Sequence, residues 1–71
     1  MRQYEHASEI LQQWMKQKGV SAAEMAEKLQ IDAGILRAIL SGRQKNISTR
    51  NMILLARYFD ISLQNLIDAL A

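Results

Sequence analysis

Two short helical segments separated by only a few residues lie between Ser21 and Gly42, and they constrain the fold of this chain more than any other feature. Ser21 and Glu24 have the spacing of a capping box, in which each side chain accepts a hydrogen bond from the backbone of the other residue. Asp32 is a second N-cap residue, and Gly42 follows the second segment, where a left-handed residue commonly ends a helix. Helices of about two to three turns are unstable alone, so both must pack against the rest of the chain.

The apolar residues of the two segments recur at helical spacing, so each segment buries one face. They are Met25, Ala26 and Leu29 in the first segment and Leu36, Ile39 and Leu40 in the second. Two short helices joined by a turn of about three or four residues form a helix-turn-helix, whose second helix usually enters the major groove of DNA. The sequence therefore predicts a helix-turn-helix over about residues 21–42.

The other residues predict three more helices and a single all-α domain spanning residues 1–71. Absence of proline and the presence of only three glycines favour helices throughout. We expect helices over residues 4 or 5 to 18, 22–29, 33–41, 49–59 and 63–70, with a polar loop at 43–47. Ser48 or Thr49 is expected to cap the fourth helix and Ser62 the fifth.

The charges are segregated along the chain. Residues 33–59 contain no acidic residue and five basic ones, whereas the remainder has four basic and seven acidic residues, so the net charge of +2 divides into +5 and −3. Such segregation makes one part of a surface attractive to a polyanion. The basic residues of the window lie on the second helix of the motif or after it.

The sequence does not indicate catalysis, metal or cofactor binding, membrane association or secretion. His6 is the only histidine and there is no cysteine, so we expect no catalytic centre, metal site or cofactor. No apolar stretch approaches the roughly 18 residues of a membrane span, and the N-terminus lacks the apolar core of a signal peptide. We therefore expect a cytoplasmic protein of bacterial, plasmid or phage origin, with no membrane association and no small-molecule ligand.

With these features the chain resembles the phage-repressor, or Xre (Cro-type), helix-turn-helix family over nearly its whole length. The resemblance rests on residues 19–21, Glu24, Met25, Ala26 and Leu29, Leu36 and Ile39, Ser41 and Gly42, and the tail at 53–63. It implies a compact five-helix, lambda-repressor-like domain that regulates transcription, in most cases as a repressor, by binding operator DNA as a dimer.

The resemblance also implies the DNA contacts. The second helix of the motif would face the bases with Ala33, Gly34 and Ala38, beside Ile35 and Arg37. Phosphate contacts would come from the following loop and from the starts of helices. The expected DNA-binding residues are Ser21, Ala33, Gly34, Arg37, Ala38, Ser41, Arg43, Lys45 and Asn46.

The chain departs from the family pattern at several positions. Gln30 replaces the glycine often found in the turn, Ala22 replaces a glutamine that grips phosphate, and Met15 and Leu40 occupy positions where many relatives pair an arginine with a glutamate. The reading helix offers little for bidentate hydrogen bonding to bases, although Ala38 or Ile35 can contact a thymine methyl group. Shape readout would then carry much of the specificity.

Two further expectations concern partners. Leu54, Tyr58, Leu63 and Leu70 are expected to form an exposed apolar patch that mediates homodimerisation. The alternative to DNA binding is a protein-binding module, such as an antirepressor, an antitoxin-like partner or an accessory factor, that uses the small apolar face of the second motif helix.

Overall fold

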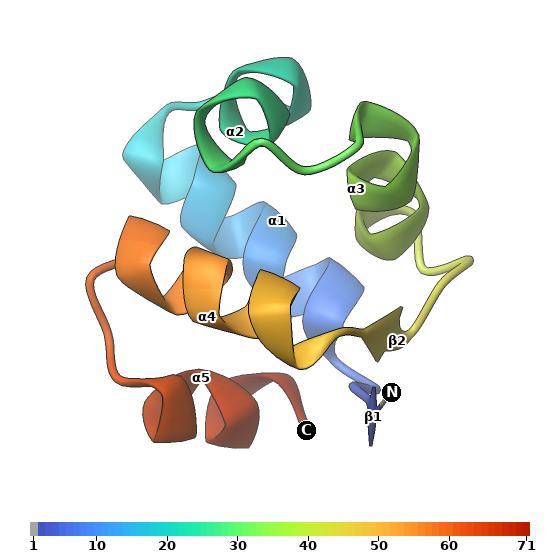
Figure 1. Ribbon diagram of the computed structural model, residues 1–71, viewed down its shortest axis with the longest axis vertical. Helices are drawn as coiled ribbons and strands as arrows, with labels where there is room; N and C mark the ends of the chain where they lie inside the picture. Colours follow the sequence, from blue (N-terminus) through green and yellow to red (C-terminus); the bar gives the residue numbers. More distant parts are fainter. Residues whose placement is uncertain (1) are drawn as a thin grey trace.

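The computed structural model describes residues 2–71, which form five α-helices and one small antiparallel sheet (Figure 1). The helices are α1 (Ala7–Lys18), α2 (Ala22–Leu29), α3 (Ala33–Leu40), α4 (Thr49–Tyr58) and α5 (Leu63–Leu70). The strands are β1 (Arg2–Gln3) and β2 (Asn46–Ile47). The predicted all-α class and the helix-turn-helix formed by α2 and α3 are confirmed.

Local sequence sets the starts of the last four helices, as predicted. Their N-cap residues are Ser21, Asp32, Ser48 and Ser62, and each side chain accepts a hydrogen bond from a backbone N–H three residues later. At α2 the capping box is complete, because the Ser21 hydroxyl accepts from the Glu24 N–H at 3.1 Å and the Glu24 carboxylate accepts from the Ser21 N–H at 3.4 Å. These caps satisfy N–H groups that have no partner within the helix.

Three helices end in the same way, with a left-handed residue followed by an apolar one. The left-handed residues are Gly19, Gln30 and Asp60, with φ of 71°, 55° and 56°. In each case the next residue donates its N–H to a carbonyl five positions earlier: Val20 to Met15, Ile31 to Ala26, and Ile61 to Ala56. This Schellman geometry turns the chain back toward the core. Gly42 is also left-handed, with φ of 84°, as predicted.

The predicted start of the first helix is wrong. Helix α1 begins at Ala7 because the residues before it pair with the segment after α3: Arg2 lies opposite Ile47, and Gln3 opposite Asn46. The Tyr4 N–H then donates to the Lys45 carbonyl at 2.9 Å, and the Tyr4 side chain is buried. An extended strand cannot at the same time form the first turn of a helix, so α1 starts late.

Smaller corrections concern other element ends. Helix α3 ends at Leu40 with Ser41 as its C-cap, and α4 ends at Tyr58 with Phe59 as its C-cap. The segment 43–47 is not wholly a polar loop, because its last two residues form β2 and Ile47 is only 1% exposed.

One apolar core joins residues from every helix. Its fully enclosed members include Leu11, Met25, Leu36, Met52, Leu55, Leu66 and Leu70. Ala26 is buried where α2 meets α3, and Met15 and Leu40 are both buried apolar residues. Leu70 was expected on an exposed patch; that prediction is wrong, because its side chain is completely buried.

Candidate nucleic-acid interface

Helix α3 divides cleanly into a core face and a solvent face. Leu36, Ile39 and Leu40 are buried, which fixes the rotation of the helix about its axis. The opposite side consists of Gly34, Ile35, Arg37 and Ser41, which are exposed, and Ala38, which is half-buried, whereas Ala33 is half-buried and packs against the core. Of the predicted base-facing residues, Gly34 and Ala38 therefore lie on the accessible surface.

The capping of α3 also explains why residue 34 is a glycine. A Cβ atom added there would lie 3.0 Å from the Asp32 Oδ1 atom, which accepts the Ile35 N–H at 3.0 Å to cap α3. A side chain at this position would thus press on the capping carboxylate. The absence of a side chain also lets another molecule approach the α3 backbone closely.

The C-terminal end of α3 is held by two side chains of α1. The Ser8 hydroxyl and the Gln12 amide both donate to the Leu40 carbonyl, and Gln12 Nε2 also donates to Ser8 Oγ at 3.2 Å. Carbonyls at a helix end have no partner within the helix, so this contact satisfies one of them and fixes α3 against α1. Sequence reasoning missed Ser8 and Gln12, because no local pattern links them to residue 40.

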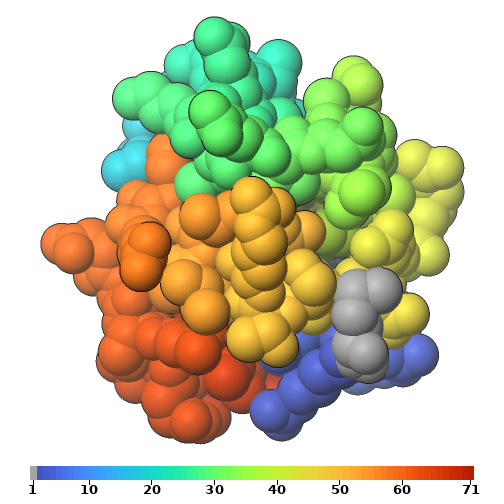
Figure 2. Space-filling model, in the orientation of Figure 1, coloured from blue at the N-terminus to red at the C-terminus, as the bar shows by residue number. Residues whose placement is uncertain are grey.

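Ser41 and Arg43 form a short polar connection where α3 passes into the loop. Arg43 Nε donates to Ser41 Oγ at 3.0 Å, and Ser41 Oγ donates to the Ala38 carbonyl at 3.1 Å. These bonds hold the exposed Arg43 guanidinium beside the end of α3. In the space-filling view the loop after α3 (yellow) borders α3 (light green) on one edge of the molecule (Figure 2).

Lys45 differs from the other cations of the basic window because it is already paired. Its Nζ donates to the Glu5 carboxylate at 2.7 Å, and this is the only ion pair among residues 2–71. The hydrogen bond from Lys45, together with its charge, lowers the pKa of Glu5. Both side chains are about half exposed, with 47% and 58% of their surfaces accessible. A phosphate that bound Lys45 would compete with Glu5.

The N-terminal strand lies beside this loop. Gln3 shares a hollow of about 410 Å³ with residues 42–46, and within it the Gln44 amide donates to the Asn46 carbonyl at 2.9 Å. The pairing of β1 with β2 thereby places Arg2 and Gln3 next to the predicted phosphate-binding loop. No local pattern in the sequence predicts this pairing, because the paired residues are more than forty positions apart.

Ser21, the remaining predicted contact, lies exposed at the start of α2. Its N–H and its hydroxyl both bond to the Glu24 carboxylate, the hydroxyl at 3.2 Å. The backbone of this helix end is therefore capped from within the chain, and a phosphate there would meet a carboxylate. Arg37, Arg50 and Arg57 are exposed and form no ion pair with residues 2–71.

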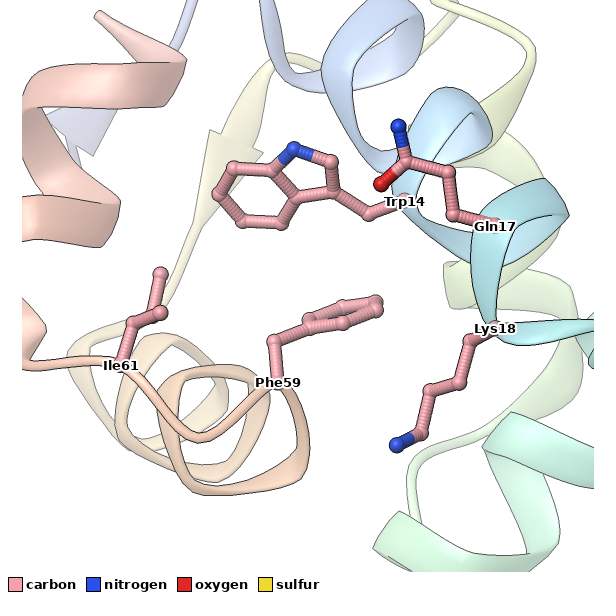
Figure 3. Close-up of a pocket in the computed structure, with 5 residues that line it drawn as sticks. All are labelled: Trp14, Gln17, Lys18, Phe59 and Ile61. Atoms are coloured by element: carbon pink, nitrogen blue, oxygen red, sulfur yellow. The ribbon is translucent and has the colours of Figure 1, made fainter.

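A second, separate surface lies between α1 and the corner that joins α4 to α5. Trp14, Gln17, Lys18, Phe59 and Ile61 surround an open groove of about 360 Å³ (Figure 3). The Trp14 and Phe59 rings meet edge to face with centroids 5.3 Å apart. No residue of α3 or of the loop after it lines this groove, so it is distinct from the basic surface.

None of the apolar residues predicted for dimerisation is well exposed: three are half-buried, and Leu70 lies in the core. Leu54, Tyr58 and Leu63 are half-buried and pack against the core. The Tyr58 ring lies edge-on to Phe59, and the Lys18 ammonium lies 5.0 Å from the centre of the Tyr58 ring. Leu70 contributes nothing to this surface.

In the part of the chain that the structure describes, no three histidine, cysteine, aspartate or glutamate side chains gather as a metal site would require. Over the same residues, no helix has the length and apolar character needed to cross a membrane.

Comparison with known proteins agrees with this arrangement. A family model described as helix-turn-helix matches residues 11–66, which include most of α1, all of α2, α3 and α4, and the first half of α5. The chain belongs to this family, the Xre-like proteins of the phage-repressor type, and is a DNA-binding helix-turn-helix domain. The family is regulatory rather than enzymatic. No curated protein and no solved structure matches the chain.

Proposed function

We propose that this protein is a transcriptional repressor that places α3 in the major groove of operator DNA. The observation that carries the proposal is the solvent face of α3, which lies beside exposed and unpaired cations in a window without acidic residues. A DNA-binding domain with this surface gains affinity from the phosphates, whatever the base sequence. Repression follows most directly, because a domain that occupies a promoter excludes other proteins from it.

Within this proposal the side chains have different roles. Arg43, positioned by Ser41, contacts a phosphate and sets the register of α3, and Lys45 and Asn46 support it from the same loop. Arg37 reaches the DNA from the middle of α3. Ala33, Gly34 and Ala38 let the helix sit deep in the groove, so that shape readout adds to direct contacts.

We further propose that the protein binds as a homodimer through α4 and α5, with Leu54, Tyr58 and Leu63 at the interface. Half-buried apolar side chains on neighbouring helices support this surface. A two-fold dimer would place two α3 helices about 34 Å apart, one turn of DNA, and would require a palindromic operator. Sedimentation of Leu63→Gln, with the exposed neighbour Gln64→Ala as control, tests the interface. A wild-type chain that stays monomeric on DNA would refute it.

The main proposal is tested by fluorescence anisotropy with a randomised duplex pool between about 50 and 200 mM salt, followed by selection of the bound fraction. Six to ten phosphate contacts predict a loss of about 10³–10⁵ in affinity over that range. Arg43→Ala should reduce the salt slope by about 0.9 for the lost contact. Lys18→Ala, which removes the same charge beside the Trp14–Phe59 groove, should leave the slope unchanged.

The outcomes separate the competing functions. A steep slope with an enriched palindrome supports a sequence-specific repressor, whereas a steep slope without enrichment indicates a binder that reads shape alone. No binding at the lowest salt would refute the proposal and favour a protein partner for the apolar surface of α3.

A further inference from the structure

Ile35 is the only large apolar side chain that is well exposed among residues 2–71, with 41% of its surface accessible. Every other large apolar residue in that range is buried or half-buried. Its position is as unusual as its exposure, because it is the third residue of α3, on the solvent face of the helix. The fold therefore leaves one large apolar side chain uncovered, on the helix proposed to read DNA.

The Ile35 side chain is also held rigidly. Its N–H donates to the Asp32 carboxylate at 3.0 Å, which fixes the first turn of α3, and the buried residues Leu36 and Ile39 fix the rotation of the helix. A β-branched side chain in a helix has essentially one preferred χ1 rotamer. Ile35 thus presents its methyl groups in a defined direction, with little conformational freedom to lose on binding.

The residues beside Ile35 on the helix surface have no polar side-chain groups. Gly34 has no side chain, and Ala38, one turn later, adds only a methyl group. Arg37 lies on the other side of the solvent face, and the Asp32 carboxylate is engaged in capping. The part of α3 around Ile35 consequently offers neither a side-chain donor nor an acceptor to a base.

We propose that Ile35 is a specificity-determining residue that recognises the C5-methyl group of thymine in the major groove. This assignment rests on the proposed placement of α3 in DNA. In the major groove the thymine methyl group is the one apolar feature that distinguishes the base pairs. The thymine methyl group packs against the side chains of Ile35 and Ala38. A base without this methyl group leaves the apolar surface of these two side chains incompletely covered.

The test uses the full chain and the duplex enriched by selection. Each thymine is replaced in turn by deoxyuridine, which keeps every hydrogen-bonding group and lacks only the methyl group. At the position facing Ile35 the affinity should fall roughly fourfold, the effect of one buried methyl group. Ile35→Ala should bind the thymine and deoxyuridine duplexes equally, whereas Ile35→Val should retain the preference.

Arg37→Ala is the matched control on the same helix face. It should weaken binding to both duplexes by the same factor and leave their ratio unchanged. Circular dichroism should show every variant folded, because both side chains are exposed.

The possible results are distinct. Tight duplex binding with no sensitivity to deoxyuridine, or a sensitivity that persists in Ile35→Ala, would overturn the assignment and leave the proposed function intact. Failure to bind any duplex would refute the proposed function and this assignment with it.

Discussion

Replacing Gln30 with glycine is expected to increase the free energy of unfolding of this domain. Gln30 has φ of 55° and ψ of 39°, and its N–H and that of Ile31 close the Schellman motif between α2 and α3. Its side chain is exposed and forms no hydrogen bond with residues 2–71. The substitution therefore removes backbone strain without removing a side-chain contact.

The size of the effect follows from two opposing quantities. A left-handed conformation costs an L-residue about 1–2 kcal/mol. Glycine increases the conformational entropy of the unfolded chain, which costs about 0.4–1 kcal/mol of stability. The difference predicts a gain between 0 and about 1.6 kcal/mol, centred near 0.8 kcal/mol. The central value corresponds to a rise in Tm of roughly 3–6 °C for a domain of this size.

Urea unfolding followed by circular dichroism measures this gain, and the m-value should stay constant. Ala23→Gly is the matched control, because Ala23 is exposed in α2 and has a helical backbone. That variant should lose about 0.5–1 kcal/mol. If Gln30→Gly loses as much stability as Ala23→Gly, the reasoning about strain at this turn is refuted.

Three further predictions concern contacts between α1 or its preceding residues and the segment from the end of α3. The double variant Ser8→Ala/Gln12→Ala should lower the free energy of unfolding by about 1–3 kcal/mol. This loss should exceed the sum of the losses in the two single variants, because only the double variant deprives the Leu40 carbonyl of both donors. Additive losses in urea unfolding would contradict this. Glu5→Gln should strengthen DNA binding, because Lys45 then contacts a phosphate without first breaking its ion pair with Glu5. An unchanged affinity in the anisotropy assay would show that Lys45 does not reach DNA. The pKa of Glu5 is lowered in the folded state, so its ion pair stabilises the protein at pH values above the unfolded pKa. This stabilisation is lost as the pH falls through the folded pKa. In Glu5→Gln, the free energy of unfolding measured against pH should lack this contribution.

Contacts between distant segments account for the incorrect predictions. The start of α1 was wrong because Arg2 and Gln3 pair with residues more than forty positions away. Leu70 fits the apolar stripe of α5, but the stripe alone does not say that this residue faces the core rather than a partner. The ion pair of Lys45 with Glu5 and the clamp of Ser8 and Gln12 on α3 likewise join residues that no local pattern relates.

Features that depend on residues a few positions apart could be predicted from the amino-acid sequence. The caps at Ser21, Asp32, Ser48 and Ser62 were evident because capping joins a side chain to a backbone N–H three residues later. The helix-turn-helix followed from two short apolar stripes and the turn between them.

Which surfaces remain available could not be predicted from the sequence and became evident from the folded structure. It showed that Lys45 is paired whereas Arg43 is held beside α3, and that Ile35 remains uncovered although most apolar residues around it are buried. The physical reason is that burial and ion pairing depend on every element that packs against a residue. Helix periodicity specifies which residues share a face, but the packing of the other elements determines whether that face is covered.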